Sequence, residues 1–393
     1  MATTFKTFLN DDITSTKTLL HEAIPITGSI VSGTYNTAGA TTETWGGTNI
    51  KNYAHGIFQS VYDYPYLSSS ANHIFDLTMG YASSSQLSGP LGDDKVQQKK
   101  KINIYNQMAQ MLVGVDQTGS VRVFDQDGDI SAGGKKMKEC IFISFARLLA
   151  KDEIKKGSFT IKIGTGSYFT PFAASGSSDY LTISDAGKEN DYRVNSPAGE
   201  YAILSATAGY AASFATAPAC GLIFYQAGIV VLSSSIFQSG SGEAGSSAWG
   251  TGGILQNCSP AGGTMQFGGI SFRPRGSVQP QFSSSLTGSS ISASCNYFRN
   301  RILDVSFNNT TELNSTIHFC RVNHNDFNYS ANPTYLSSSQ IRVKNNPLDS
   351  PISYLTTIGL YSSDNELLAV AKVSEPLKKD PTNEMTIRVR LDY

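Results

Sequence analysis

Three acidic side chains occupy alternate positions in a short polar segment. Asp125, Asp127 and Asp129 offer carboxylates with the spacing that calcium-binding loops use. An EF-hand loop also needs glycine at its sixth position and glutamate at its twelfth, whereas Gly128 stands fourth and Lys136 twelfth. We therefore expect a hairpin turn built on Asp-Gly, with calcium binding as the alternative.

The histidines form no familiar metal-binding motif. The sequence has five, and neither HxxxH nor HExxH occurs: His21, His55, His73, His318 and His324. His318 and His324 are the one close pair, and on an extended strand their side chains would face the same side. We expect packing or hydrogen bonding from them, with a metal site as the alternative.

The usual nucleophile motif is absent too. No G-x-S-x-G occurs, and Ser239-Gly240-Ser241-Gly242 has the wrong spacing, so we interpret it as a flexible link. Paired carboxylates for glycoside hydrolysis need only spatial closeness, and nothing selects a pair. The chain has no internal repeat, which argues against a repetitive β-solenoid enzyme. We expect no catalytic, cofactor-binding or metal-binding residues, and hence no enzyme.

Basic residues gather in two short runs. Lys99–Lys101 falls in a predicted helix, where a solvated or salt-bridging face is expected and phosphate or nucleic-acid binding is the alternative. Lys155-Lys156 follows Asp152-Glu153, so this segment balances its own charge and predicts a turn. The net charge of −1 argues against general nucleic-acid binding, which needs a basic field.

Aromatic residues cluster twice, in residues 53–66 and 327–335. Such side chains could stack on sugars. More often they belong to a core or a subunit interface, which is the role we expect.

Composition favours assembly. Charged residues make up 16% of the chain, below the roughly 25% of typical soluble domains, and Ser, Thr, Asn and Gly take their place. A surface with few charges suits large contacts between subunits, because few charges must lose their water. We therefore expect a homo-oligomer.

The cysteines and apolar runs indicate the compartment. No CxxC pair occurs among the five cysteines, which we expect to be small buried side chains in a protein made in a reducing cytoplasm: Cys140, Cys220, Cys258, Cys295 and Cys320. Met1–Lys6 has no secretory pattern. The longest apolar stretch, Gly221–Leu232, is shorter than the roughly 20 residues of a membrane span, so we expect none.

Helical signals concentrate in the N-terminal third. Residues 1–30 predict a helix that Asp11 or Asp12 caps and Pro25 ends, and residues 53–66 partly fit a helical face stopped by Pro65. The best helix covers residues 93–113, with Gly114 just past its end. The apolar stripes of the two better-defined helices are Ile13, Leu19, Leu20 and Ala23, and Ile104, Met108, Met111 and Leu112.

Strand signals dominate elsewhere, so we predict a mainly β fold with a few N-terminal helices and antiparallel sandwich- or barrel-like modules. Local composition and the expected secondary structure divide the chain into a mixed α/β region at 1–164, a β-rich region at 165–264 and an antiparallel β domain at 265–393. Residues 31–50 and 238–263 are loops or exchanged arms. The strands expected before residue 350 are Val121–Phe124, Gly157–Ile163, Tyr180–Ile183, Tyr201–Leu204, Leu222–Tyr225, Ile229–Leu232, Met265–Phe272, Ile302–Phe307 and Thr316–Val322.

The C-terminal segment predicts an antiparallel meander. Tyr354–Leu360, Glu366–Val373 and Met385–Asp392 favour strands, and a charged link, Leu377–Asp380, separates the last two. The third alternates strictly between apolar and polar residues, which is typical of a strand with one buried face.

Four blocks carry a resemblance to a known class of proteins. They are Thr357–Pro376, Phe327–Tyr335, Gly221–Leu232 and Lys151–Phe159. Together they resemble virion structural proteins of large contractile-tailed bacteriophages, T4-like phages of marine and cyanobacterial hosts above all. The resemblance implies a virion component of the tail, baseplate, neck or fibre attachment, whose partners are other virion proteins. A receptor- or glycan-binding virion module is the alternative.

Overall fold

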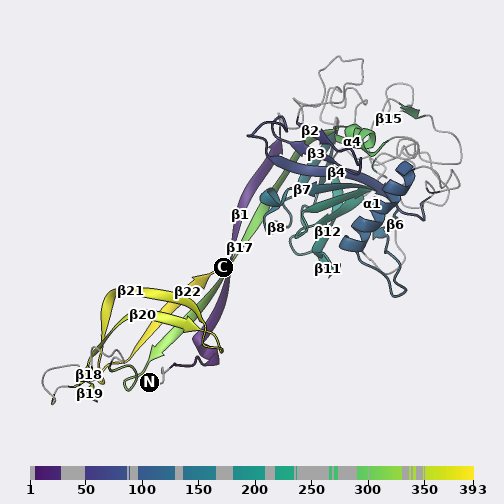
Figure 1. Ribbon diagram of the computed structural model, residues 1–393. Helices are drawn as coiled ribbons and strands as arrows, with labels where there is room; N and C mark the ends of the chain where they lie inside the picture. The colour runs from purple at the N-terminus through teal and green to yellow at the C-terminus, as the bar shows by residue number, and fades with distance from the viewer. Residues whose placement is uncertain are drawn as a thin grey trace. The chain divides into compact units, whose positions relative to one another are not determined.

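A computed structural model of the 393-residue chain describes residues 5–27, 49–85, 88, 96–128, 136–164, 180–208, 217–233, 236, 265–267, 270–272, 290–299, 301–329, 336–337, 340–341, 348 and 350–393. The loops or arms expected at 31–50 and 238–263 lie outside these ranges, apart from Asn49 and Ile50. The described chain is mainly β with antiparallel strand pairs, as predicted (Figure 1).

Helices are few. A 3₁₀ turn, η1 (Asn10–Asp12), precedes the α-helices α1 (Val96–Leu112), α2 (Arg147–Ala150) and α4 (Ile291–Arg299). Helix α4 shows that helices are not confined to the N-terminal third. The strands are β1 (Ile13–Thr27), β2 (Ile50–Asn52), β3 (Gln59–Tyr62), β4 (His73–Tyr81), β5 (Phe124–Asp125), β6 (Lys136–Met137), β7 (Glu139–Phe145), β8 (Glu153–Ile154), β9 (Thr160–Gly164), β10 (Tyr180–Ser184), β11 (Arg193–Ser196), β12 (Gly199–Ala208), β13 (Ala219–Phe224), β14 (Ile229–Ser233), β15 (Met265–Phe267), β16 (Ile270–Phe272), β17 (Ile302–Val322), β18 (Leu336–Ser337), β19 (Gln340–Ile341), β20 (Ser353–Tyr361), β21 (Leu367–Lys379) and β22 (Met385–Asp392).

The chain divides into two compact units. Unit 1 comprises residues 1–20 and 312–393, and unit 2 comprises residues 21–311. Strands β1 and β17 each contribute residues to both units. The boundaries expected at 164/165 and 264/265 were placed where local composition changes along the chain. They do not coincide with the boundaries of the two compact units.

Unit 2 is built on a long antiparallel sheet with the strand order β17-β9-β10-β12-β13-β14-β7-β4-β3-β2. Strands β13 and β14 lie in its middle, and their continuous apolar sequences are buried almost throughout. Gly228 makes the turn between them possible, because its φ of 65° lies in the left-handed region that favours glycine. Both strands were predicted, and the structure confirms them.

Helix α1 packs directly on strand β4 (Figure 1). The contact occurs at Gly80, where an added Cβ would lie 2.6 Å from the carbonyl oxygen of Lys101. The helix ends as predicted, because Gly114 adopts a φ of 78° and donates its N–H to the Ala109 carbonyl at 3.0 Å. The predicted stripe is only partly buried, since Met111 is 49% exposed.

The helix expected within residues 1–30 is wrong, because residues 13–27 form strand β1. Thr14, Thr16 and Thr18 recur at every second position after Ile13, and β-branched side chains favour extended backbone. Pro25 is compatible with this position, since β1 is the last strand in the sheet order and a proline without an N–H is tolerated at an edge.

The helical interpretation of residues 53–66 is also wrong. Strands β2 and β3 form a hairpin in which Ile50 pairs with Val61 and Asn52 pairs with Gln59. Gly56 in the connecting loop has a φ of 60°. The rings form two contacts, Tyr53 with Phe58 in the loop and Tyr62 of β3 with Tyr66 beyond the strand.

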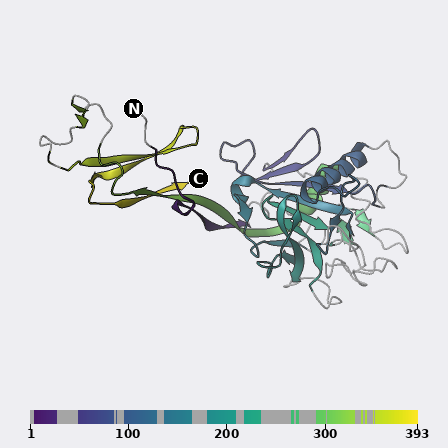
Figure 2. The same ribbon diagram turned by 90° about the horizontal axis from the view of Figure 1, so that it is seen from below.

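The three-stranded meander expected at the C-terminus is wrong, because the strands of unit 1 pair differently. Strands β20 and β21 pair with each other, but β22 pairs with β17, from Ser315↔Asp392 to Val322↔Met385. Figure 2 shows these strands from below. The alternation predicted for β22 is confirmed, since its apolar side chains are the less exposed ones. The charged link is wrong, because β21 continues through Lys379.

Lys379 ends strand β21 as a fully buried amine. Its Nζ donates to the His324 carbonyl at 3.1 Å, to Asn328 Oδ1 at 2.6 Å and to the Asp380 carbonyl at 2.7 Å. These acceptors replace the water that the buried amine has lost.

The cysteines with described positions carry free thiols. Cys140, Cys220 and Cys295 are buried, as expected, and Cys320 is half-buried. Burial raises the pKa of Cys295 to about 12. Cys258 lies outside the described residues.

Substitution of Gly80 should test the contact between α1 and β4. Gly80→Ala puts a methyl group against the helix backbone, which must move, so we expect a loss of about 2–3 kcal/mol in unfolding free energy. Gly187→Ala is the control, because Gly187 has a φ of 78° but open space around it, and it should cost about 1 kcal/mol. Urea denaturation of both variants measures the difference. Equal losses would contradict the close approach.

Candidate interaction surface

The acidic segment near Asp125 forms a turn with an ion pair. Asp125 is buried, and Lys136 Nζ contacts its Oδ2 where β5 pairs with β6. Burial raises the pKa of Asp125. Gly128 has a φ of 77°, as the Asp-Gly turn requires. Asp129 lies outside the described residues. Asp125 forms an ion pair with Lys136, and this contact stabilises the β5–β6 pair.

The two close histidines do not lie on one strand. His318 belongs to β17 and its ring packs against Phe8, with centroids 5.3 Å apart. His324 lies beyond the end of β17, where its carbonyl accepts a hydrogen bond from Lys379. The expected shared parity is therefore wrong, because the strand ends at Val322.

The three consecutive lysines of α1 have three different environments. Lys99 is exposed, and Lys100 Nζ donates to the His55 carbonyl at 2.7 Å. Lys101 lies on the buried face of the helix, and burial lowers its pKa to about 8. The expectation of one solvated face is wrong for Lys101, since a helix turns by 100° per residue and consecutive side chains point in different directions.

The pH dependence of the unfolding free energy should reveal the lowered pKa of Lys101. Its folded pKa of about 8 lies below the ordinary 10.5, so between these values the unfolded chain holds a proton that the folded chain lacks. Stability therefore rises with pH in this window. Relative to Lys101→Met, the wild type should gain about 2–3 kcal/mol from pH 7 to pH 10 in urea denaturation. Lys99→Met is the control and should follow the wild-type profile. A wild-type profile parallel to that of Lys101→Met would contradict the shifted pKa.

The aromatic cluster of residues 53–66 is partly self-contained. Tyr53 stacks on His55 with centroids 5.0 Å apart, Phe58 contacts both rings, and Lys51 Nζ lies 4.9 Å from the Tyr53 centroid. These contacts hold the tip of the β2–β3 hairpin. They do not by themselves favour a sugar ligand. In the second cluster Phe327 and Tyr329 are exposed, and residues 330–335 lie outside the described ranges.

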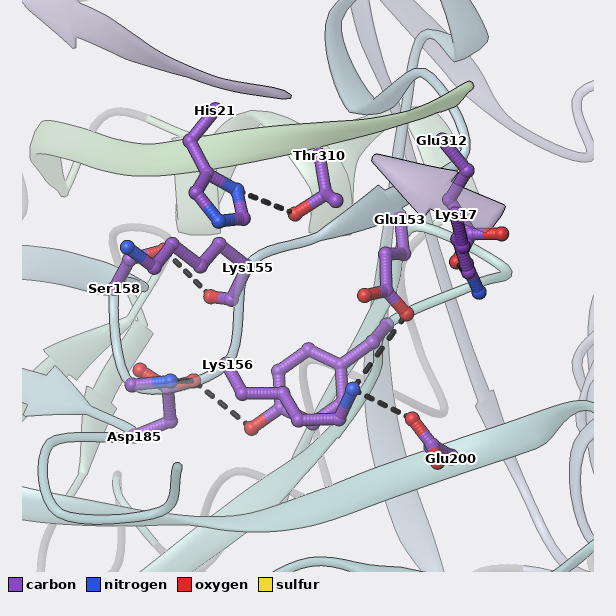
Figure 3. Close-up of polar contacts among 12 residues, drawn as sticks. Lys17, His21, Glu153, Lys155, Lys156, Ser158, Asp185, Glu200, Thr310 and Glu312 are labelled. Carbon is purple, nitrogen blue, oxygen red and sulfur yellow. Dashed lines mark hydrogen bonds and ion pairs between the residues drawn. The ribbon is translucent and has the colours of Figure 1, made fainter. Parts of the chain in front are cut away.

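The turn in the block Lys151–Phe159 is held by a buried carboxylate (Figure 3). Asp185 Oδ2 accepts the Gly157 N–H at 2.8 Å and the Tyr225 hydroxyl at 2.9 Å, and its Oδ1 accepts the Phe159 N–H at 2.8 Å. Gly157 has a φ of 76°. Burial raises the pKa of Asp185 despite these three donors. The turn predicted at Lys155-Lys156 is confirmed.

Lys156 completes this arrangement from the other side. Its Nζ lies 2.5 Å from Glu200 Oε2 and 3.6 Å from Glu153 Oε2 (Figure 3). It also lies over the rings of Tyr192 and Tyr225, 4.9 and 5.5 Å from their centroids. Burial lowers the pKa of Lys156, but the two carboxylates outweigh burial and raise it. Every charged group here faces a protein partner, so the arrangement serves to hold the turn.

Removal of the Asp185 carboxylate should destabilise the protein strongly. Asp185→Ala leaves the buried Phe159 N–H and Tyr225 hydroxyl and the half-buried Gly157 N–H without their acceptor, so we expect a loss of about 3–5 kcal/mol in unfolding free energy. Asp191→Ala is the matched control, because Asp191 pairs with Lys188 and Arg193 at the surface, and it should cost less than about 1 kcal/mol. A loss at Asp185 no larger than the control would contradict its role.

Unit 1 exposes apolar side chains in unusual density. Most of the large apolar side chains that are well exposed in the described chain belong to this smaller unit: Phe5, Phe8, Leu9, Ile13, Leu19, Leu20, Leu313, Phe327, Tyr329, Leu348, Tyr354, Tyr361, Leu367, Leu368, Val370 and Tyr393. Scattered exposed apolar side chains are normal on any protein, whereas a contiguous group marks an interaction site.

Part of this surface is contiguous, at the turn end of the β20–β21 hairpin. A Cβ built on Gly359 would lie 2.9 Å from the Tyr361 ring and 3.1 Å from Leu367, so both side chains cover the glycine. Val370 pairs with Gly359 across the strands, and Phe5 meets the Tyr361 ring edge-on with centroids 5.0 Å apart. These five residues and Leu368, the apolar patch, form our candidate interaction surface.

The sequence pattern did not predict this patch. Its one signal is the neighbouring pair Leu367-Leu368, because adjacent apolar residues break the alternation that a strand with one buried face should show. The register explains the break, since it shifts between Leu360 and Tyr361 and leaves Leu368 as the extra residue of a β-bulge.

The described part of the chain was also searched for metal sites and membrane-spanning helices. No group of three or more His, Cys, Asp or Glu side chains there could hold a metal ion, and none of the helices described is long and apolar enough to cross a membrane. No protein-family model matches the sequence, and no curated protein or solved structure matches it either.

Proposed function

We propose that this protein is a structural component of a contractile-tailed phage particle, located in the tail or baseplate, at the neck or at a fibre attachment point. It works through contacts between subunits and has no reactive centre. It is made in the host cytoplasm, and its partners are other virion proteins and further copies of itself. The observation that carries the proposal is the exposed apolar surface of unit 1.

The free-energy cost of exposing that apolar surface to water supports a protein that works in an assembly. Leu368 is 68% exposed, Tyr354 63% and Val370 53%, and all three lie on the same hairpin. Exposed apolar area is unfavourable in water at about 25 cal/mol per Å², and burial against a partner removes this cost.

Two of the four blocks that resemble phage virion proteins coincide with features of unit 2. The block Gly221–Leu232 contains the buried hairpin β13–β14, and the block Lys151–Phe159 contains the turn that Asp185 holds. A third block, Thr357–Pro376, contains the apolar patch apart from Phe5. These positions suit a protein with a stable framework in unit 2 and a contact surface in unit 1.

The proposal predicts that the protein is part of the particle. Mass spectrometry and electron microscopy of purified phage should find it in fixed copy number. Leu9→Glu together with Tyr329→Glu, two exposed positions on unit 1, should lower its incorporation at least about tenfold, since charges resist burial. Val194→Glu, at a 70% exposed position of unit 2, is the control and should leave incorporation unchanged. Absence of the protein from particles would refute the proposal.

A further inference from the structure

Polar and aromatic side chains converge where β2, β3 and β4 lie side by side, at one end of the unit 2 sheet (Figure 1). Lys51, Ser60 and Asp76 pair with one another across these three strands, so their side chains share a face. Ser60 is buried, whereas Lys51 and Asp76 are half-buried on either side of it. Two strand spacings, or about 10 Å, separate the backbones that carry the cation and the anion.

The Asp76 carboxylate is oriented through one of its two oxygens. Its Oδ1 accepts a hydrogen bond from the Ser60 hydroxyl and another from His73 Nε2 at 2.9 Å. The Tyr53 hydroxyl lies 3.2 Å from Ser60 Oγ and donates to it, because the Ser60 proton is directed at the carboxylate. No hydrogen bond or ion pair from the residues that the structure describes engages Asp76 Oδ2. This side chain, 34% exposed, therefore presents one fixed acceptor to the solvent side.

Aromatic rings adjoin this acceptor. The centroid of the Tyr62 ring lies 5.5 Å from that of His73 and 6.4 Å from that of Tyr66. Burial raises the pKa of Tyr62, and the neighbouring Tyr53 hydroxyl and Asp76 carboxylate raise it further, so the Tyr62 hydroxyl lies beside the same polar groups. Tyr66 is 37% exposed. Rings in this position offer apolar surface to a ligand whose polar groups reach the carboxylate.

We propose that this face binds a neutral saccharide. Asp76 Oδ2 accepts hydrogen bonds from its hydroxyl groups, and Lys51 Nζ donates to its oxygens from the other side. The rings of Tyr62 and Tyr66 contact its C–H groups. This binding site belongs to unit 2 and is independent of the apolar patch, so it adds a ligand to the proposed function and does not rest on it.

The two opposite charges are the reason to choose a neutral ligand. Lys51 Nζ lies 4.9 Å from the centroid of the Tyr53 ring, and in the described chain Asp76 forms its ion pair with His73 and not with Lys51. A cationic ligand drawn to Asp76 would meet Lys51, and an anionic ligand drawn to Lys51 would meet Asp76, so either would be repelled. Hydroxyl groups both donate and accept hydrogen bonds, so a sugar satisfies both side chains at once.

Binding to neutral oligosaccharides tests the proposal. The purified full chain should bind at least one member of an array of glucose, galactose, mannose and N-acetylglucosamine oligosaccharides, and titration calorimetry should then give the affinity. Asp76→Asn and Lys51→Met should each weaken this binding at least about tenfold, since each removes the charge from one hydrogen-bonding partner of the sugar. Asp191→Asn is the matched control, because Asp191 forms its ion pairs elsewhere on the surface of unit 2, and it should bind as the wild type does.

Urea denaturation of the same variants separates lost binding from lost folding. Asparagine keeps the shape of Asp76, and Lys51 is half-buried on the last strand of the sheet order, so both variants should unfold near the wild-type midpoint. If Asp76→Asn unfolds early, Lys51→Met decides the outcome. The absence of binding to every neutral oligosaccharide at millimolar concentration would overturn the proposal, as would binding confined to acidic or amino sugars or an equal loss in the control. None of these results would alter the incorporation expected of the proposed virion component.

Discussion

Strand β17 is the constraint on which the rest of the structure depends. Its residues 302–306 pair with β9, residues 309–310 pair with β8 and residues 315–322 pair with β22. An extended backbone must satisfy its N–H and C=O groups through partners beside it, so each of these strands relies on the same 21-residue segment. Because β17 contributes residues to both units, strand pairing in each unit depends on it.

The two units differ in how fully they bury their apolar residues. Unit 2 buries nearly complete strands such as β13 and β14, whereas the buried apolar side chains described for unit 1 are few: Ile317, Val322, Leu360 and Val389. A small β unit has too little interior to cover all its apolar residues. What remains outside is therefore available for contacts between subunits, which agrees with an assembly role.

Several residues that resemble functional groups serve the fold instead. Lys101 and Lys379 are buried amines, and Asp125 and Asp185 are buried carboxylates with protein partners. Buried charges cost free energy unless protein groups replace water around them, and Lys379, Asp125 and Asp185 have such partners. Chemistry of this kind stabilises turns and strand ends.

The sequence by itself determined the fold class, helix α1 with its glycine end, the turn at Lys155-Lys156 and part of the strand set, such as β9, β10, β13 and β14. These depend on local patterns: alternation, apolar runs and residues suited to turns. It could not separate β1 from a helix or place β22 beside β17, because pairing joins residues far apart in the chain. The burial of Lys101 and the bulge that exposes Leu368 were likewise decided by tertiary structure, since both depend on which face packs against a neighbouring element.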